Sequence, residues 1–125
     1  MITLIPSREP NAAQKAQIAR KYGMFIHFGI NTFNNTEWSD GTLPLDSYAP
    51  DAIDADSWVR HAYAAGMNYV ILITKHHDGF CLWPSEYTDF CVKNSSYNGD
   101  IVKEVSDECH KQCMDFGVYL SPWDM

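Results

Sequence analysis

The stretch YVILITKHHDGF at residues 69–80 decides the fold, because an unbroken apolar run passes directly into polar side chains that bind and exchange protons. The run at 69–73 lacks the alternation of a half-exposed strand and is typical of a parallel strand covered on both faces. The polar residues at 75–78 therefore follow the carboxyl end of a buried strand. Ligands of parallel α/β proteins bind at these ends, so the stretch predicts a site as well as a strand.

Strands are predicted on both sides of this one. Upstream, residues 24–29 (MFIHFG) read as a short buried strand that ends on a histidine and a glycine, and an amphipathic helix at about 11–22 precedes it. Downstream, residues 118–120 form a third strand. Between them lie two long polar and aromatic loops, at 31–50 and 82–97, and unstructured loops of that length are uncommon unless they are functional.

A helix is predicted in each interval between the strands. Asp54 or Asp56 can cap the first, which ends at Gly66, a natural left-handed terminator. Asp100 caps the second, which runs to about residue 115 and is stopped by Gly117. The order strand, helix, strand, helix, strand indicates parallel strands with right-handed crossovers.

Two α/β folds fit this order, a doubly wound sheet and a (β/α)₈ barrel. The glycine fingerprint of a dinucleotide-binding sheet does not follow the strand at 24–29. A barrel needs about 250 residues. We therefore expect residues 1–125 to be the first three βα units of a truncated (β/α)₈ TIM-like barrel, and thus an incomplete single domain.

Composition excludes several classes of partner. The formal charge of −7, from 16 acidic and 9 basic residues, would repel the phosphates of nucleic acid. No apolar segment is long enough for a membrane span, and no signal peptide is visible. We expect neither nucleic acid nor membrane as a partner, and a cytoplasmic location by default.

The four cysteines, Cys81, Cys91, Cys109 and Cys113, form no Cys-x-x-Cys pair and are expected to be reduced. Cys109 and Cys113, with His110 between them, could suggest a metal site on the second helix. Their apolar neighbours make that face look like core, so we expect buried thiols.

Three histidines follow two of the predicted strands. Consecutive parallel strands are usually neighbours, which would bring His27, His76 and His77 within reach of one pocket. A lone His27 could instead bond a backbone carbonyl inside the core. Neutral imidazoles both donate and accept hydrogen bonds, which suits the hydroxyls of a sugar or polyol.

Other polar and aromatic residues at this end support a sugar site. Asp78 is a candidate catalytic carboxylate or metal ligand, but an Asp-Gly turn favours a structural role or the orientation of a histidine. Glu37 and Trp38 combine a carboxylate with an apolar plane that can stack on a pyranose. Tyr119 could line the pocket or belong to the core. The adjacent His76 and His77 would diverge in a strand, so we expect no metal and no other cofactor, with a metal-dependent barrel hydrolase left open as an alternative.

Several blocks of this sequence resemble the amino-terminal part of α-L-fucosidases of glycoside hydrolase family 29. The likeness runs from about residue 20 to the end, and it rests on KYGMFIHFG at 21–29, EW at 37–38, KHHDGFCLW at 75–83, YTDF at 87–90 and FGVYLS at 116–121. The resemblance implies a barrel hydrolase without a cofactor that releases terminal α-linked L-fucose from a fucosylated oligosaccharide or glycoconjugate. It implies substrate-binding roles for His27, Glu37, Trp38, His76, His77 and Tyr119. The SPWD block at 121–124 looks like the branch that acts on α-1,3/1,4-linked fucose.

The resemblance also implies that the catalytic carboxyl groups lie elsewhere. Family members retain anomeric configuration, which requires two carboxyl groups roughly 5–5.5 Å apart, and the family's nucleophilic aspartate and acid/base lie beyond Met125. Residues 1–125 alone are therefore expected to be inactive, marginally stable and prone to self-association through unpaired strand edges. A non-catalytic sugar-binding protein, or a split subunit completed by another chain, is the alternative.

Overall fold

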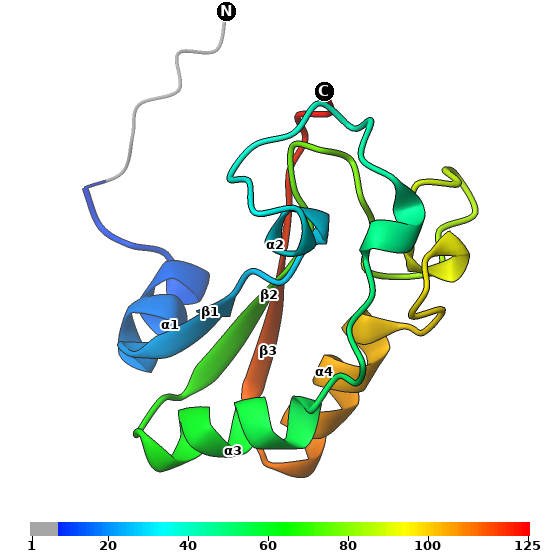
Figure 1. The fold of residues 1–125 in the computed structure, drawn as a ribbon. Coiled ribbons are helices and arrows are strands. Elements are labelled where there is room, and N and C mark those ends of the chain that lie inside the picture. The colour runs from blue at the N-terminus through cyan, green and yellow to red at the C-terminus, as the bar shows by residue number, and fades with distance from the viewer. Residues whose placement is uncertain (1–7) are drawn as a thin grey trace, which may run out of the picture.

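The centre of the computed structural model, which describes residues 8–125, is a three-stranded parallel sheet in the order β1-β2-β3 (Figure 1). The strands are β1 Gly23–Ile26, β2 Tyr69–Lys75 and β3 Asp115–Leu120. β2 pairs with both neighbours, so all three strands end at the same edge of the sheet. The predicted α/β class with parallel neighbouring strands is confirmed.

Two helices cover one face of this sheet, α3 Ala55–Ala64 and α4 Ile101–Lys111 (Figure 1). Aspartates cap both: Asp54 accepts from the Ser57 N–H and Asp100 from the Lys103 N–H. The core between helices and sheet contains Val59, Ala62, Val70, Leu72, Ile101, Val105 and Cys109. Of the helices within residues 8–125, none has the length and apolar character needed to cross a membrane.

The first helix, α1 Ala12–Arg20, buries no side chain, so the expected apolar face is not used here. A capping box between Asn11 and Gln14 stabilises its start. Its last residue, Arg20, forms an ion pair with Asp115 at 2.7 Å. This pair ties α1 to the beginning of β3, at the end of the sheet opposite the polar strand ends.

The end of α4 differs from the prediction. The helix stops at Lys111, four residues earlier than expected, and Cys113 adopts a left-handed conformation with φ 56°. The Met114 N–H then reaches back to the Cys109 carbonyl, which closes a Schellman-type end. Gly117 consequently lies inside β3 and does not terminate the helix. Cys109 is buried as predicted, whereas Cys113 is exposed, so the predicted burial of its thiol was wrong.

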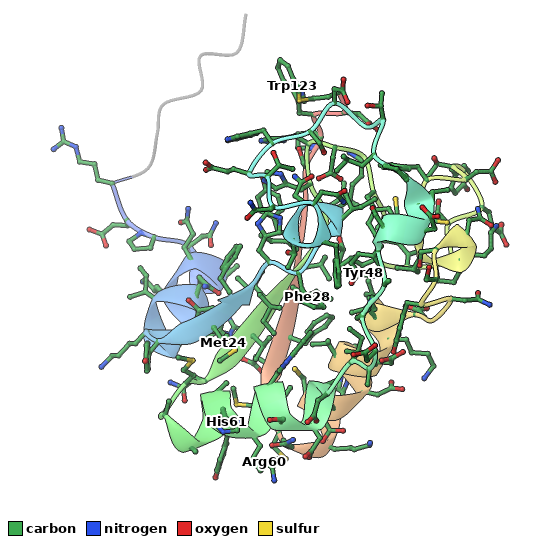
Figure 2. All side chains as sticks on the ribbon, viewed as in Figure 1. Met24, Phe28, Tyr48, Arg60, His61 and Trp123 are labelled. Atoms are coloured by element: carbon green, nitrogen blue, oxygen red, sulfur yellow. The ribbon has the colours of Figure 1, made fainter. Side chains whose placement is uncertain are left out.

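The loops after β1 and β2 pack on a second, aromatic cluster. β1 ends at Ile26 rather than at Gly29, and the chain continues into α2 Ile30–Phe33 and the 3₁₀ turn η1 Leu45–Ser47, with another such turn, η2 Val92–Asn94, after β2. Fully buried Tyr48 lies at the middle and donates its hydroxyl to the Phe28 carbonyl at 3.0 Å. Figure 2 shows both residues between the loops and the sheet. The rings in contact are Phe28, Phe33, Tyr48, Trp58, Phe80 and Phe90. This packing holds the two loops over the carboxyl ends of the strands.

Candidate functional site

Aromatic side chains from all three strands gather at the carboxyl edge of the sheet. His27 follows β1, His76 and His77 follow β2, and Tyr119 lies near the end of β3. The ring centroids are 4.7 Å apart for His27 and His76, and 4.2 Å apart for His76 and His77. Tyr119 stacks against His76 at 6.0 Å. Three imidazoles and a phenol are therefore neighbours, with His76 at their centre.

Trp38 completes this group from the loop after β1. Its indole stacks on His77 with ring centroids 5.3 Å apart and an interplanar angle of 12°, and it lies 5.8 Å from His76. The indole is nevertheless largely exposed, so part of its apolar surface is open to solvent. We refer to His27, Trp38, His76, His77 and Tyr119 as the ring cluster.

Glu37, the sixth predicted site residue, is placed differently. It is exposed, and the hydrogen bond that fixes it involves its backbone carbonyl, which accepts from the Asn31 side chain at 3.1 Å. Within residues 8–125 its carboxylate makes no hydrogen bond or ion pair with the imidazoles. The structure thus brings five of the six predicted residues together and leaves the carboxylate of Glu37 outside the ring cluster.

A buried hydrogen-bond network joins the two loops that carry the ring cluster. Asp78 and Asn31 are both buried. The Asp78 carboxylate accepts from the Phe80 N–H at 2.8 Å and from the Asn31 amide at 3.3 Å. Ser39 in turn donates to the Asn31 carbonyl oxygen at 2.6 Å. The predicted turn-stabilising role of Asp78 is confirmed, and no hydrogen bond between Asp78 and a histidine occurs in the described part of the chain.

A second network anchors the loop after β3. Ser121 Oγ lies 2.7 Å from Nδ1 of His77. The Lys75 ammonium donates to the backbone carbonyls of Ser121 and Trp123, at 3.0 Å each, and lies 3.6 Å from Asp124. Trp123, at the carboxyl end of the chain, is labelled in Figure 2. The ends of β2 and β3 are thereby joined beneath the ring cluster.

Sequence reasoning assigned no role to Asn31, Lys75 or Ser121. Each is a polar residue within a few positions of a strand end, and that position was the available signal. Each has a partner 44 to 47 positions away along the chain, and that pairing depends on how the loops pass each other in space.

The surroundings of His76 favour its neutral form. Burial lowers the pKa of His76 below the usual value of about 6.5, and positive charge on His27 or His77 would lower it further. At neutral pH the His76 ring is therefore uncharged and can both donate and accept a hydrogen bond. No group of three or more His, Cys, Asp or Glu side chains in residues 8–125 is arranged to hold a metal ion.

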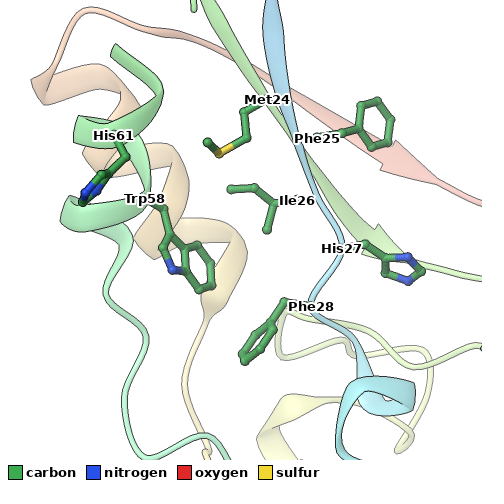
Figure 3. Close-up of a pocket in the computed structure, with 7 residues that line it drawn as sticks. All are labelled: Met24, Phe25, Ile26, His27, Phe28, Trp58 and His61. Atoms are coloured by element: carbon green, nitrogen blue, oxygen red, sulfur yellow. The ribbon is translucent and has the colours of Figure 1, made fainter. Parts of the chain in front are cut away.

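An apolar groove of about 440 Å³ lies beside β1, on the side of the strand away from the ring cluster. It is lined by Met24, Phe25, Ile26, His27, Phe28, Trp58 and His61. Figure 3 shows Met24 and Ile26 directed toward α3, whereas Phe25 and His27 point to the opposite side of the strand. The imidazole of His27 faces the ring cluster, so we do not count the groove as part of this site.

Comparisons with known proteins point to one family. The sequence model of the family described as Alpha-L-fucosidase matches residues 35–125. The chain is 43% identical over 118 residues to Alpha-L-fucosidase 1 of Arabidopsis thaliana, covering 92% of this chain and 23% of the plant protein. It therefore spans about a quarter of the length of that relative.

Solved structures show the same likeness. A glycoside hydrolase 29 family member from an unknown rumen bacterium is 40% identical with a TM-score of 0.87, over 92% of this chain and 21% of that one. An α-L-fucosidase of Bacteroides thetaiotaomicron, trapped as a covalent intermediate with 2-fluoro-fucosyl fluoride, is 30% identical with a TM-score of 0.79, over 97% of this chain and 32% of that one. At these identities the agreement extends to sequence as well as fold.

Proposed function

The chain belongs to the α-L-fucosidase family, and from this membership we propose that it supplies the fucose-binding part of a retaining α-L-fucosidase active site. The observation that carries the proposal is the ring cluster, in which His27, His76 and His77 adjoin one another at the carboxyl edge of the sheet. Its substrate is terminal α-linked L-fucose on an oligosaccharide or glycoconjugate.

The ring cluster has the chemistry that a deoxyhexose needs. A sugar hydroxyl is both a donor and an acceptor, and a neutral imidazole offers one group of each kind. The lowered pKa of His76 keeps its ring in that neutral form at physiological pH. The exposed indole of Trp38 offers an apolar plane to the C–H face of the sugar, and Tyr119, beside His76, lines the pocket. Glu37 serves as a further acceptor once its carboxylate turns toward the ligand.

Hydrolysis needs groups that this part of the family's barrel does not contribute. Retention requires two carboxyl groups about 5–5.5 Å apart, and Asp78, the buried carboxylate nearest the imidazoles in sequence, is committed to the Phe80 N–H and Asn31. We assign nucleophile and acid/base to the part of the full family barrel that this chain does not cover. The chain's own contribution is to bind and orient the sugar ring.

Within the family, we propose the branch that acts on α-1,3/1,4-linked fucose. The support is the sequence block at 121–124, SPWD, which follows β3 and is held by Lys75. Trp123 of this block is largely exposed close to the carboxyl edge of the sheet. An exposed indole there could contact the sugar to which fucose is linked.

Titration of L-fucose into the chain tests the proposal. We expect saturable binding that His76→Ala and His77→Ala each weaken about tenfold or more, because each removes a hydrogen bond to the ligand and part of the ring cluster. L-Rhamnose, another 6-deoxyhexose with differently oriented hydroxyls, should bind more weakly than L-fucose.

The matched control is His110→Ala. His110 is an exposed histidine on α4 whose ring bonds the Ser106 carbonyl at 2.7 Å, so its loss should leave fucose affinity unchanged. Unchanged affinity in both His76→Ala and His77→Ala would remove the ring cluster from the proposal.

A further inference from the structure

The environment of Ser121 bears on which nitrogen of His77 carries the proton. Ser121 is only 1% exposed. Its Oγ has three polar neighbours: His77 Nδ1 at 2.7 Å, the Trp123 N–H at 3.1 Å and the Trp123 carbonyl at 3.1 Å. A hydroxyl has one proton to donate and two lone pairs to accept with, so three neighbours are the number it can satisfy.

The roles of two of these neighbours are fixed by their chemistry. The Trp123 N–H can only donate and the Trp123 carbonyl can only accept. If the Ser121 proton goes to the carbonyl, Oγ has one lone pair left for His77, and Nδ1 must be the donor. All three contacts are then hydrogen bonds. If the proton goes to Nδ1 instead, Oγ and the Trp123 carbonyl face each other without a proton between them.

Lys75 stabilises the turn at residues 121–123. Its ammonium donates to the carbonyls of both Ser121 and Trp123, which sets the turn that aims the Ser121 hydroxyl at the Trp123 carbonyl. A carbonyl oxygen has two lone pairs, so the Trp123 carbonyl can accept from Lys75 and Ser121 together. The first proton arrangement uses every donor and acceptor of this buried turn, as buried polar groups generally do.

We propose that Ser121 is a positioning residue that holds His77 as the Nδ1–H tautomer, so that Nε2 is an obligatory hydrogen-bond acceptor for a hydroxyl of the ligand. The part of this inference that concerns the ligand rests on the proposed function. Nε2 lies across the ring from Nδ1 and makes no hydrogen bond to residues 8–125. A ligand must therefore present a donor at this position, and a sugar that lacks that hydroxyl, or carries fluorine there, is rejected.

Nitrogen-15 NMR of the full chain labelled on histidine tests the tautomer directly. Long-range proton–nitrogen correlations separate a protonated from an unprotonated ring nitrogen, and His77→Gln identifies the His77 signals. At about pH 8 we expect His77 to show a protonated Nδ1 and an unprotonated Nε2. Ser121→Ala should convert this single form into a mixture of tautomers and weaken L-fucose binding about tenfold.

Ser85→Ala is the matched control. Ser85 is 3% exposed, accepts from the Tyr87 N–H at 3.1 Å, and has a carbonyl that accepts from Lys93 at 3.3 Å. Like Ser121, Ser85 accepts from the N–H two residues later and has a carbonyl that bonds a lysine, but it contacts no histidine. Its variant should keep both the His77 tautomer and the fucose affinity.

The possible outcomes separate this inference from the proposed function. A protonated Nε2 on His77 in the unsubstituted chain, or a tautomer unchanged by Ser121→Ala, overturns the role of Ser121. A protonated Nδ1 in a chain that binds no fucose overturns the proposed function and leaves the tautomer assignment standing.

Discussion

His76 is the most surrounded titratable residue of the ring cluster. Its ring contacts His27, Trp38, His77 and Tyr119. Burial is the main cause of its lowered pKa, and the two neighbouring imidazoles act in the same direction, opposed by the nearby carboxylate of Asp78. Keeping the His76 ring neutral is a condition for its use as a combined donor and acceptor.

A pH dependence of stability follows from this shift. Because the pKa of His76 is lower in the folded than in the unfolded chain, the unfolded chain binds more protons below about pH 6.5. The free energy of unfolding should therefore fall as the pH decreases from 7 to 5. His76→Gln should make this fall shallower in chemical denaturation series measured at successive pH values.

Tyr119→Phe provides the control for that series. It alters a ring beside His76 without removing an imidazole, so the pH dependence of the original chain should persist. A His76→Gln variant whose stability declines as steeply as that of the original chain would show that His76 is not responsible.

The histidines of the ring cluster could be predicted individually, whereas the residues that hold their loops in place could not. His76 and His77 stand directly behind an unmistakable buried strand, and their position alone marks them. Asn31 and Ser121 each bond a residue of another loop, and apart from their positions near strand ends nothing in the local pattern distinguishes them from ordinary loop residues. Glu37 stays a prediction, because it is exposed and its carboxylate makes no hydrogen bond or ion pair with the imidazoles within residues 8–125.

Among the elements, α4 shows where sequence signals are strong and where they fail. Its start was predictable because Asp100 caps it and apolar residues recur at helical spacing. Its end was not, because Gly117 is the more familiar stop signal. The structure uses Cys113 instead, in a conformation that a residue with a Cβ adopts only at a cost.

That conformation yields a prediction for the stability of α4. A residue other than glycine in the left-handed region is strained by roughly 1–2 kcal/mol. Substitution by glycine removes this strain, but glycine loses more conformational entropy on folding, which offsets part of the gain. Cys113→Gly should therefore raise the free energy of unfolding by about 0.5–1 kcal/mol, as measured by chemical denaturation.

Cys113→Ala is the control for this substitution. It removes the exposed thiol but keeps the Cβ, so its stability should stay close to that of the original chain. Equal stabilisation by alanine and glycine would mean that the thiol, and not the backbone conformation, is responsible.

For the whole molecule, the order of elements determined the sheet while the loops determined the site. Consecutive parallel strands joined by helical crossovers are usually neighbours, so β1-β2-β3 followed from the pattern. The contacts between Tyr48, Phe28 and Phe80 that hold the loops join segments with no shared periodicity, and no pattern in the sequence indicated them.

The last prediction concerns the edges of this sheet. Within residues 8–125, β1 and β3 each pair on one side only, and Phe25, Val118 and Leu120 on these strands are largely exposed. Unpaired strand edges with exposed apolar side chains favour association between chains. The net charge of −7 opposes it, but salt screens that repulsion, with a Debye length of about 10 Å at 0.1 M.

We therefore expect residues 1–125, expressed alone, to self-associate more strongly as protein and salt concentrations rise. Analytical ultracentrifugation should show the average mass increasing with both. Val118→Lys should suppress the increase, because a charge on an edge strand blocks strand pairing. Ile18→Lys, at an exposed position on α1 rather than on a strand, adds the same charge and should suppress it less. A chain that remains monomeric at every salt concentration would contradict the expected association. Equal suppression by the two lysines would mean that net charge and not the strand edge controls it.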